Sequence, residues 1–470
     1  MKEYIKKILF FLLFILPFIL GTIGYCLEQA PIQDAAYGAF TLYAINPVIE
    51  GDNIFIQMAR WLAPLVLASG IFLAVKELGA RLRNFFTGSD PDSVTIYSDS
   101  SMGEILKKNI PRSILTDSDS VYNSRKNIII FSDDKKTLEF YSRNREKFSG
   151  KNIYIKLDNF YSFRNGDAVR AFNLNDIAAR EYWAERNLMK YYTVGNSGGM
   201  NVRIGIVGFD DLGEKLLKNG LLANIYSPGQ CIEYHIWGDS VLYENLHKDF
   251  HTMNSDKIIF HHTAAEEEPD VLTKMDRIIL TGSVGYKLLA SLCEICIHSE
   301  IDCFDPDGII SDIYIDERVR SFGGHEEVFT AENIMTDKLY QAAMKLNHHY
   351  AGTYGEASDM ESEWDKLNYF TKMSNIAATD YHRVRLMLME ADGSREIDDR
   401  VSELEHIRWC RFHFLNHWKY GETADGKKDP ENLLHPCLVP FDELSQIDKD
   451  KDTESIKTLM EIFADENGHG

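Results

Sequence analysis

The chain has 470 residues, with 50 basic and 72 acidic side chains, a formal net charge of −22 and 44% hydrophobic residues. This length predicts two to four domains. The acidic balance argues against a nucleic-acid partner held through its phosphates, and against a soluble part that lies flat on an anionic membrane. Seven scattered cysteines, an odd number, are typical of a reduced cytosolic protein.

Two apolar stretches predict a membrane α-hairpin over residues 1–86. Tyr4–Leu27 and Ile54–Val75 are each about long enough to cross a bilayer core of roughly 30 Å as helices. Basic residues flank the hairpin at both ends, whereas the loop between the stretches has acidic residues and no basic ones. The positive-inside rule therefore places the protein in the inner (cell) membrane, with both termini cytoplasmic. A cleaved signal peptide is the alternative interpretation of the first stretch.

The loop of the hairpin contains a short apolar segment, Asp34–Asn46, between Pro31 and Pro47. Prolines at these places are typical of a short helix. Such a helix either re-enters the membrane or lies on its outer leaflet. No TVGYG-like filter follows it, so potassium selectivity is not supported. Two helices cannot enclose a pore alone, so a channel would require a homo-oligomer.

Beyond the hairpin, apolar strands alternate with helices. Residues 87–195 and 200–335 form two such series, separated by the glycine- and serine-rich Gly195–Gly199. This pattern predicts an α/β fold with two tandem Rossmann-like parallel-sheet domains. The strands expected are Ser93–Ser98, Asn127–Ser132, Asn152–Leu157, Val202–Val207, Cys231–Trp237, Lys257–His261, Arg277–Thr281 and Ile301–Phe304. A helical linker, residues 336–395, follows them.

The strand-to-helix turns are where a dinucleotide would bind. In the second unit the turn keeps Gly208 and Gly213 of the G-x-G-x-x-G fingerprint, but Asp210 replaces the middle glycine. Asp239 is the candidate for holding a ribose. These four residues are the candidate cofactor site, with NAD(H) or another adenine nucleotide as the cofactor class. The alternative is a fold kept for shape, which the first unit favours because Gly103 is the only glycine left in its turn.

The most specific pattern lies in residues 396–466, where we expect a small α-helical domain. It contains Glu-x-x-His-x-x-Trp, then Trp-x-Tyr-Gly and His-Pro-x-Leu-x-Pro-Phe, and it resembles the ryanodine-receptor (RyR) repeat domain. The residues that carry the resemblance are Glu403, His406, Trp409, Trp418, Tyr420, Gly421, His435, Pro436, Leu438, Pro440, Phe441 and Leu444.

The aromatic and polar groups of this module predict a ligand reader that stacks a purine-like base. The candidate ligand-binding residues are His406, Trp409, Trp418, Tyr420, Gly421, His435 and Pro436. The alternative is that these aromatics form the core of a domain too small to fold without them.

The domain order also resembles a prokaryotic family that joins a two-helix, potassium-channel-like segment to TrkA-N (KTN-type) domains and, in some members, an RyR domain. The resemblance rests on Asp34–Phe40, Met58–Leu65, Val169–Arg180 and Val202–Leu217. It implies a ligand-gated membrane effector that senses a nucleotide or small metabolite, in nucleotide signalling or defence.

The alternative function is a non-conducting, membrane-tethered scaffold that binds a nucleotide. We expect no enzyme, because the sequence offers no catalytic nucleophile–base pair and no metal-ligand set. The partners expected are the membrane, further copies of the chain and a small nucleotide-like ligand, but no nucleic acid.

Overall fold

The computed structural model describes residues 2–117, 121–158, 169–193, 200–282, 285–313, 316–335, 338–354, 359–422 and 426–467. The linker expected at Gly195–Gly199 lies outside the described residues. The chain divides into two compact units, residues 1–91 with 122–125, and residues 92–121 with 126–470. Each unit is described by itself below.

The first unit is a helical hairpin. It consists of the helices α1 (Lys2–Leu27), α2 (Ile32–Thr41) and α3 (Ile54–Ser89) and the 3-10 turn η1 (Leu42–Ala44). The helices approach closely at two glycines of α1, because a Cβ at Gly21 would lie 2.9 Å from Ala39 and one at Gly24 would lie 2.6 Å from Ile56.

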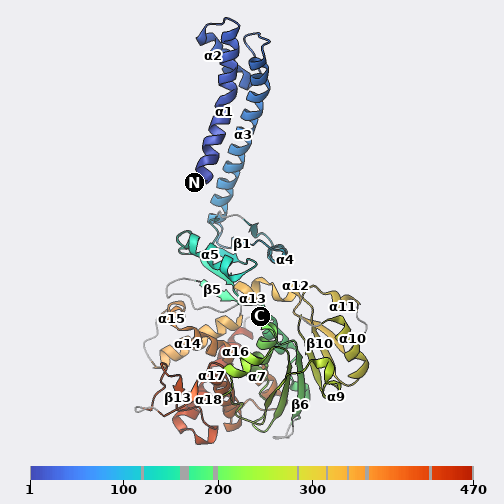
Figure 1. Cartoon of the computed structure of the whole chain (residues 1–470). Coiled ribbons are helices and arrows are strands. Elements are labelled where there is room, and N and C mark those ends of the chain that lie inside the picture. Colours follow the sequence, from blue (N-terminus) through green and yellow to red (C-terminus); the bar gives the residue numbers. More distant parts are fainter. Residues whose placement is uncertain are drawn as a thin grey trace. The chain divides into compact units, whose positions relative to one another are not determined.

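The short helix α2 folds back along α1 (Figure 1). In η1, the Tyr43 hydroxyl donates to the Phe14 carbonyl and the two rings lie 5.4 Å apart. The chain then returns to the level of Glu28, which accepts the Asp52 and Asn53 amides at 2.9 and 3.1 Å. Phe14 lies about 20 Å below Glu28 at 1.5 Å per residue. The path of α2 and η1 therefore runs along α1 and not across the end of the hairpin.

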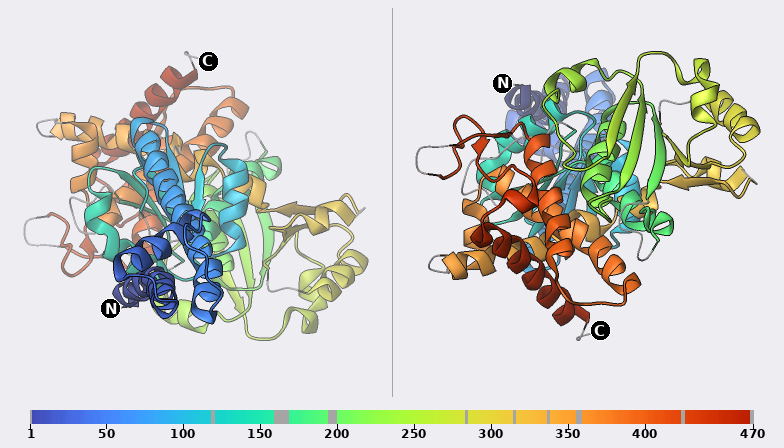
Figure 2. Two further views of the ribbon diagram at one scale, coloured as in Figure 1. Left: turned by 90° about the horizontal axis from the view of Figure 1, so that it is seen from above. Right: turned by 90° about the horizontal axis from the view of Figure 1, so that it is seen from below.

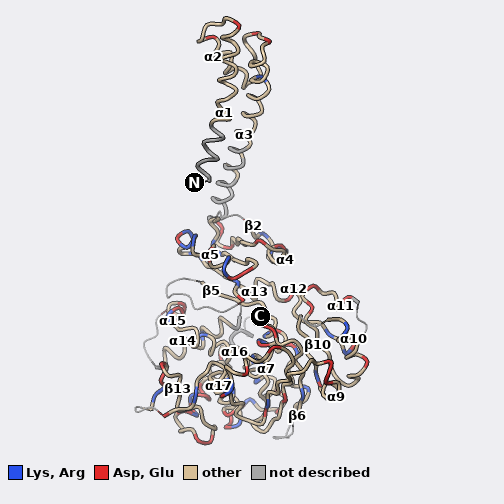
Figure 3. The backbone as a smooth tube through the Cα atoms, in the orientation of Figure 1, with Lys and Arg blue, Asp and Glu red and all other residues tan. Residues whose placement is uncertain are grey.

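One described helix segment, Ile54–Phe72 in α3, is long and apolar enough to cross a membrane, and Leu12–Leu27 in α1 is a shorter apolar stretch. Arg60 is the single charged residue of these two segments. Figure 3 shows how sparse charge is along this part of the hairpin. By length and composition alone this is weak support for membrane insertion, because core helices and signal sequences pass the same test.

The second unit contains two parallel β-sheets, as predicted. Sheet A has the order β2-β1-β3-β4-β5, and sheet B has the order β11-β10-β9-β6-β7-β8. The strands of sheet A are β1 (Val94–Tyr97), β2 (Ile114–Thr116), β3 (Lys126–Ile129), β4 (Asn152–Lys156) and β5 (Val169–Phe172). Those of sheet B are β6 (Asn201–Val207), β7 (Cys231–Trp237), β8 (Lys257–His261), β9 (Arg277–Leu280), β10 (Glu300–Phe304) and β11 (Val319–Phe322).

The strand order of sheet B is that of a dinucleotide-binding Rossmann fold, counted 3-2-1-4-5-6 from its first strand β6. The order reverses between β6 and β9, and in sheet A between β1 and β3. Helices connect the parallel strands. They are α4 (Ser101–Asn109), α5 (Asp134–Asn144), α6 (Leu174–Glu185), α7 (Asp211–Ala223), α8 (Val241–Leu246), α9 (Pro269–Leu272), α10 (Tyr286–Ile295) and α11 (Ile309–Ile313).

Helix α6 follows the last strand of sheet A but packs against α7 and sheet B. The Trp183 indole donates to the Leu216 carbonyl at 2.8 Å, and the Tyr182 hydroxyl donates to Asp302 at 2.8 Å. Apolar residues of both sheets consequently belong to one hydrophobic cluster. The two α/β domains are therefore joined by packing as well as by the chain.

The C-terminal region is helical, as predicted. It comprises α12 (His325–Val328), α13 (Ala331–Met335), α14 (Lys338–Tyr354), α15 (Met360–Lys366), α16 (Tyr369–Ala391), α17 (Asp399–Leu415) and α18 (Gln446–Asn467), with the short strands β12 (Lys419–Tyr420) and β13 (Leu434–His435). Figure 2 shows these orange and red helices beside the green strands of sheet B.

A buried ion pair joins α17 to the second α/β domain. Arg411 of α17 and Asp256 are both fully buried, 2.6 Å apart. The Arg411 guanidinium also donates to the carbonyls of Leu221 and Thr252 at 2.8 and 2.7 Å, and to the Asn254 side chain at 2.8 Å. Asp256 in turn accepts from the Ile232 amide and the Gln230 side chain.

We expect Arg411→Met to destabilise the second unit by about 3–5 kcal/mol, because it leaves the Asp256 carboxylate buried without its cation. Urea denaturation of the detergent-solubilised chain measures this loss. The matched control is Lys419→Met, which breaks the exposed pair with Asp249 and should leave the unfolding midpoint unchanged. Equal midpoints for Arg411→Met and wild type would contradict the prediction.

Candidate functional site

The turn after β6 is built around Asp210, which caps helix α7. Its carboxylate accepts the Gly213 amide at 3.0 Å and lies 3.1 Å from the Thr281 hydroxyl. Gly208 has a φ of +95°, which L side chains rarely adopt. A Cβ at Gly213 would lie 2.4 Å from the Gly208 carbonyl oxygen, so this glycine permits close packing of strand and helix.

The Asp210 carboxylate occupies the place where a dinucleotide pyrophosphate would meet the helix N-terminus. It already satisfies an amide of the first turn and adds negative charge there. The residues at this turn therefore do not fit a pyrophosphate. Asp239 directly follows β7 and is exposed, which is the position of a ribose-binding acid in this fold. The sequence separation between Gly208 and Asp239 is larger than usual for this fingerprint. The position of Asp239 after the second strand is nevertheless the usual one.

The turn after β1 also contains an aspartate with several hydrogen-bond partners. Asp99 accepts the Ser132 amide at 2.9 Å and the Ser132 hydroxyl at 3.0 Å, and it pairs with Lys136. These bonds hold the pKa of Asp99 below its usual value, although burial opposes the shift. Asp99 thus links the ends of β1 and β3 across the point where the strand order reverses. Asp210 thus fills the phosphate position of the second α/β domain, whereas Asp99 does not cap α4, whose N-cap Ser100 forms no side-chain cap bond.

In the C-terminal region, α17 presents Trp409 among three histidines. The Trp409 ring lies 3.9 Å from His413, 4.8 Å from His435 and 5.8 Å from His406, measured between ring centroids. The His413 Nδ1 donates to the Trp409 carbonyl at 2.8 Å. The His435 Nδ1 accepts the Cys437 amide at 3.1 Å, so the neutral ring carries its proton on Nε2. Burial lowers the pKa of His435 to about 4, and this ring is therefore neutral.

The other predicted ligand residues differ in exposure. Trp418 is buried against Phe370, with ring centroids 5.3 Å apart, so it is a core residue. Tyr420 is 51% exposed, and its hydroxyl donates to Glu422 at 3.2 Å. Gly421 packs against Leu434. Pro436 is half-buried in the same loop as His435. Tyr420, Trp409 and His435 are thus the predicted residues that a ligand could reach.

His406 is buried, and its contacts hold neighbouring elements together. It lies 3.2 Å from Asp452 of α18 through Nδ1 and 2.8 Å from the Val439 carbonyl through Nε2. Burial alone would lower its pKa, but the hydrogen bonds with Asp452 and Cys410 outweigh this and raise the pKa to about 10. The imidazolium therefore ties α17 to α18 and to the loop before it.

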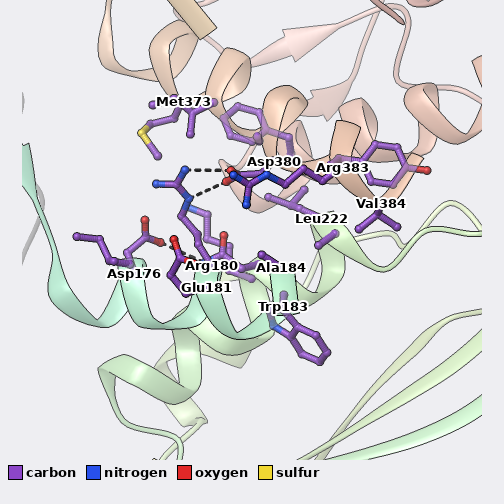
Figure 4. Close-up of a pocket in the computed structure, with 18 of the residues that line it drawn as sticks. Asp176, Arg180, Glu181, Trp183, Ala184, Leu222, Met373, Asp380, Arg383 and Val384 are labelled. Atoms are coloured by element: carbon purple, nitrogen blue, oxygen red, sulfur yellow. Dashed lines mark hydrogen bonds and ion pairs between the residues drawn. The ribbon is translucent and has the colours of Figure 1, made fainter. Parts of the chain in front are cut away.

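A cavity that sequence reasoning missed lies between α6, α7 and α16 (Figure 4). Arg180 of α6 forms a bidentate ion pair with Asp380 of α16, with hydrogen bonds of 2.7 and 2.9 Å. Glu181, Lys218 and Arg383 also line the cavity. Its helices come from three parts of the chain, so no local motif could have revealed it.

Comparison with known proteins identifies the C-terminal module. The family model of the RyR domain matches residues 377–466, so the chain carries an RyR domain. The match begins inside α16, ahead of residue 396, where the sequence pattern placed the boundary. None of the curated proteins matches the chain in sequence.

Two solved structures resemble parts of the chain. D-lactate dehydrogenase from Escherichia coli, in its apo form, is 14% identical, with 56% of this chain and 98% of that chain covered and a TM-score of 0.22. TP0037 from Treponema pallidum, a D-lactate dehydrogenase, is 12% identical, with 64% and 97% covered and a TM-score of 0.17.

The His406–Asp452 contact predicts a pH dependence of stability. Because the folded-state pKa of His406, about 10, exceeds the ordinary value of about 6.5, its contribution is complete below pH 6.5 and is lost as the pH rises toward 10. The unfolding midpoint should therefore fall between pH 7 and pH 9. In His406→Gln this slope should be smaller. Identical slopes in the two proteins would contradict the assignment.

Proposed function

We propose that the protein is a ligand-gated membrane effector, in which the RyR and Rossmann-like domains sense a nucleotide-like ligand and the helical hairpin responds. The observation that carries this proposal is the connection between hairpin and sensor. Helix α3 ends at Ser89 and β1 begins at Val94, so only four residues join them. Four residues span at most about 14 Å, which makes the hairpin sensitive to any displacement of sheet A.

The apolar hairpin supports a place in the inner (cell) membrane with both termini in the cytoplasm. Its basic flanks and acidic loop follow the positive-inside rule. The backfolded helix α2 would supply an inward-dipping element, and several copies of the hairpin would be needed to surround a pore. We therefore propose a homo-oligomer in the inner membrane and assign no enzymatic role.

The RyR domain is the ligand reader in this proposal. Trp409 offers a half-buried ring, and Tyr420 an exposed one, to a purine-like base. The His435 Nε2–H supplies a hydrogen-bond donor beside Trp409. The aspartate-filled turn after β6 favours a ligand read by stacking and hydrogen bonds over NAD(H) held by its pyrophosphate. An adenine nucleotide in signalling or defence suits this chemistry.

The alternative function is a non-conducting, membrane-tethered nucleotide-binding scaffold. The observation that favours it is the Asp210 cap on α7, since a fold that fills this phosphate position with its own carboxylate can serve for shape alone. The two functions differ in ion flux. A ligand that binds the reconstituted protein but produces no flux in liposomes would select the scaffold.

We expect ADP-ribose, ATP or NAD to bind the detergent-solubilised chain through Tyr420. Tyr420→Ala removes one stacking partner, worth about 1–3 kcal/mol, so affinity should fall about tenfold or more. Titration calorimetry measures the change. The matched control is Tyr286→Ala, which alters an equally exposed tyrosine of α10. Unchanged affinity in Tyr420→Ala would place the site elsewhere.

A second experiment tests the topology. A reporter fused after Gly470 should be cytoplasmic, and one inserted at Gly51, in the loop between α2 and α3, should be external. The opposite labelling would overturn the hairpin arrangement. Recovery of a chain cleaved near Gly24 would instead identify the first stretch as a signal peptide.

A further inference from the structure

The cavity between α6, α7 and α16 has the properties of a separate binding site. Its volume is about 70 Å³, room for roughly five water molecules. A nucleotide is too large to be enclosed there. Helix α6 follows sheet A, α7 belongs to sheet B, and α16 enters the RyR domain, so one small molecule in this space would touch all three domains.

Two side chains of opposite charge line this cavity without a partner. Glu181 and Lys218 are both half-buried, and neither forms an ion pair or hydrogen bond within the described part of the chain. The guanidinium of neighbouring Arg180 is engaged by Asp380, so it attracts Glu181 without forming an ion pair with it. An uncompensated charge held partly away from water is costly, and a ligand that supplies the missing partner would recover that cost.

The acid–base behaviour of the two groups agrees with this geometry. Burial raises the pKa of the Glu181 carboxyl, although the nearby guanidinium of Arg180 opposes the shift. Burial lowers the pKa of the Lys218 ammonium, against the opposing charge of Asp176. For both groups, therefore, burial outweighs the opposite charges nearby, which are Arg180 and Arg383 for Glu181 and Asp176 and Glu214 for Lys218.

The rest of the wall combines apolar side chains with the charged Asp176, Arg180, Asp380 and Arg383. Trp183 and Leu222 contribute from the α/β side, and Ile376, Val384 and Phe412 from the RyR side. The apolar side chains suit a compact hydrocarbon body, while Glu181 and Lys218 fix its orientation.

We propose that this cavity binds a small zwitterionic metabolite of the amino-acid class, with its ammonium group facing Glu181 and its carboxylate facing Lys218. The ligand would be an additional effector, distinct from the nucleotide-like ligand of the RyR aromatic face. The site depends neither on membrane insertion nor on nucleotide binding. By contacting α6 and α16 together, the metabolite would reinforce the junction that Arg180 and Asp380 already bridge.

The test uses the full chain in detergent with L-alanine and L-valine as probes, followed by calorimetry and thermal unfolding. N-acetylalanine, which lacks the ammonium group, and alaninamide, which lacks the carboxylate, are the matched ligand controls. We expect binding of the two amino acids and at least about tenfold weaker binding of each derivative. Equal binding of the derivatives, or no binding of either amino acid, would overturn the proposal.

Protein variants supply the second arm. Glu181→Gln and Lys218→Gln should each weaken amino-acid binding about tenfold or more. Each should also keep or raise the unfolding temperature of the ligand-free chain, because a partly buried unpaired charge is removed. The controls are Glu185→Gln on α6 and Lys215→Gln on α7, which lie outside the cavity lining and should bind like wild type. Wild-type affinity in both cavity variants would refute the assignment.

Discussion

The junction between the domains of the second unit depends on one buried guanidinium. Arg411 extends from the RyR domain into the second α/β domain, where it pairs with Asp256 and donates to two backbone carbonyls. A buried pair of this kind adds little net stability, yet it tolerates only one geometry. It therefore fixes the register of α17 against α7, and the aromatic groups around Trp409 take their positions from that register. A rigid junction of this kind can pass a ligand-induced shift from one domain to the other.

The long apolar strands could be predicted from the sequence because each carries its own signal. Val202–Val207 and Cys231–Trp237 are mostly apolar, and both form interior strands of sheet B. The short strands β2, β5 and β11 could not be predicted, since edge strands of three or four residues with polar side chains form only through their neighbours. The helical segment before residue 396 suggested a linker, but Tyr381 and Val384 of α16 are core residues.

The sequence could predict where the candidate site lies, but not what each of its residues does there. The sequence singles out Asp210 as a residue that disfavours a pyrophosphate, but only the structure shows why its carboxylate is useful there. The cavity between α6, α7 and α16 was beyond sequence reasoning altogether. Its bridging residues, Arg180 and Asp380, are 200 positions apart, and nothing in the sequence pairs one with the other. Contacts between segments that are distant in the sequence produce no hydrophobic periodicity or motif from which they could be predicted.

The contacts of helix α6 cannot all form as soon as the helix has been synthesised. It follows sheet A, but its tyrosine partner Asp302 comes 120 residues later, in β10. At ribosomal speeds of about 5–20 residues per second, the buried face of α6 waits on the order of ten seconds for its partner. During that interval Tyr182 lacks its partner, whereas the Leu216 carbonyl that Trp183 contacts follows after 33 residues. The N-terminal α/β domain is thus complete only after the second α/β domain has been synthesised. Until then, chaperones can bind its unpacked surface.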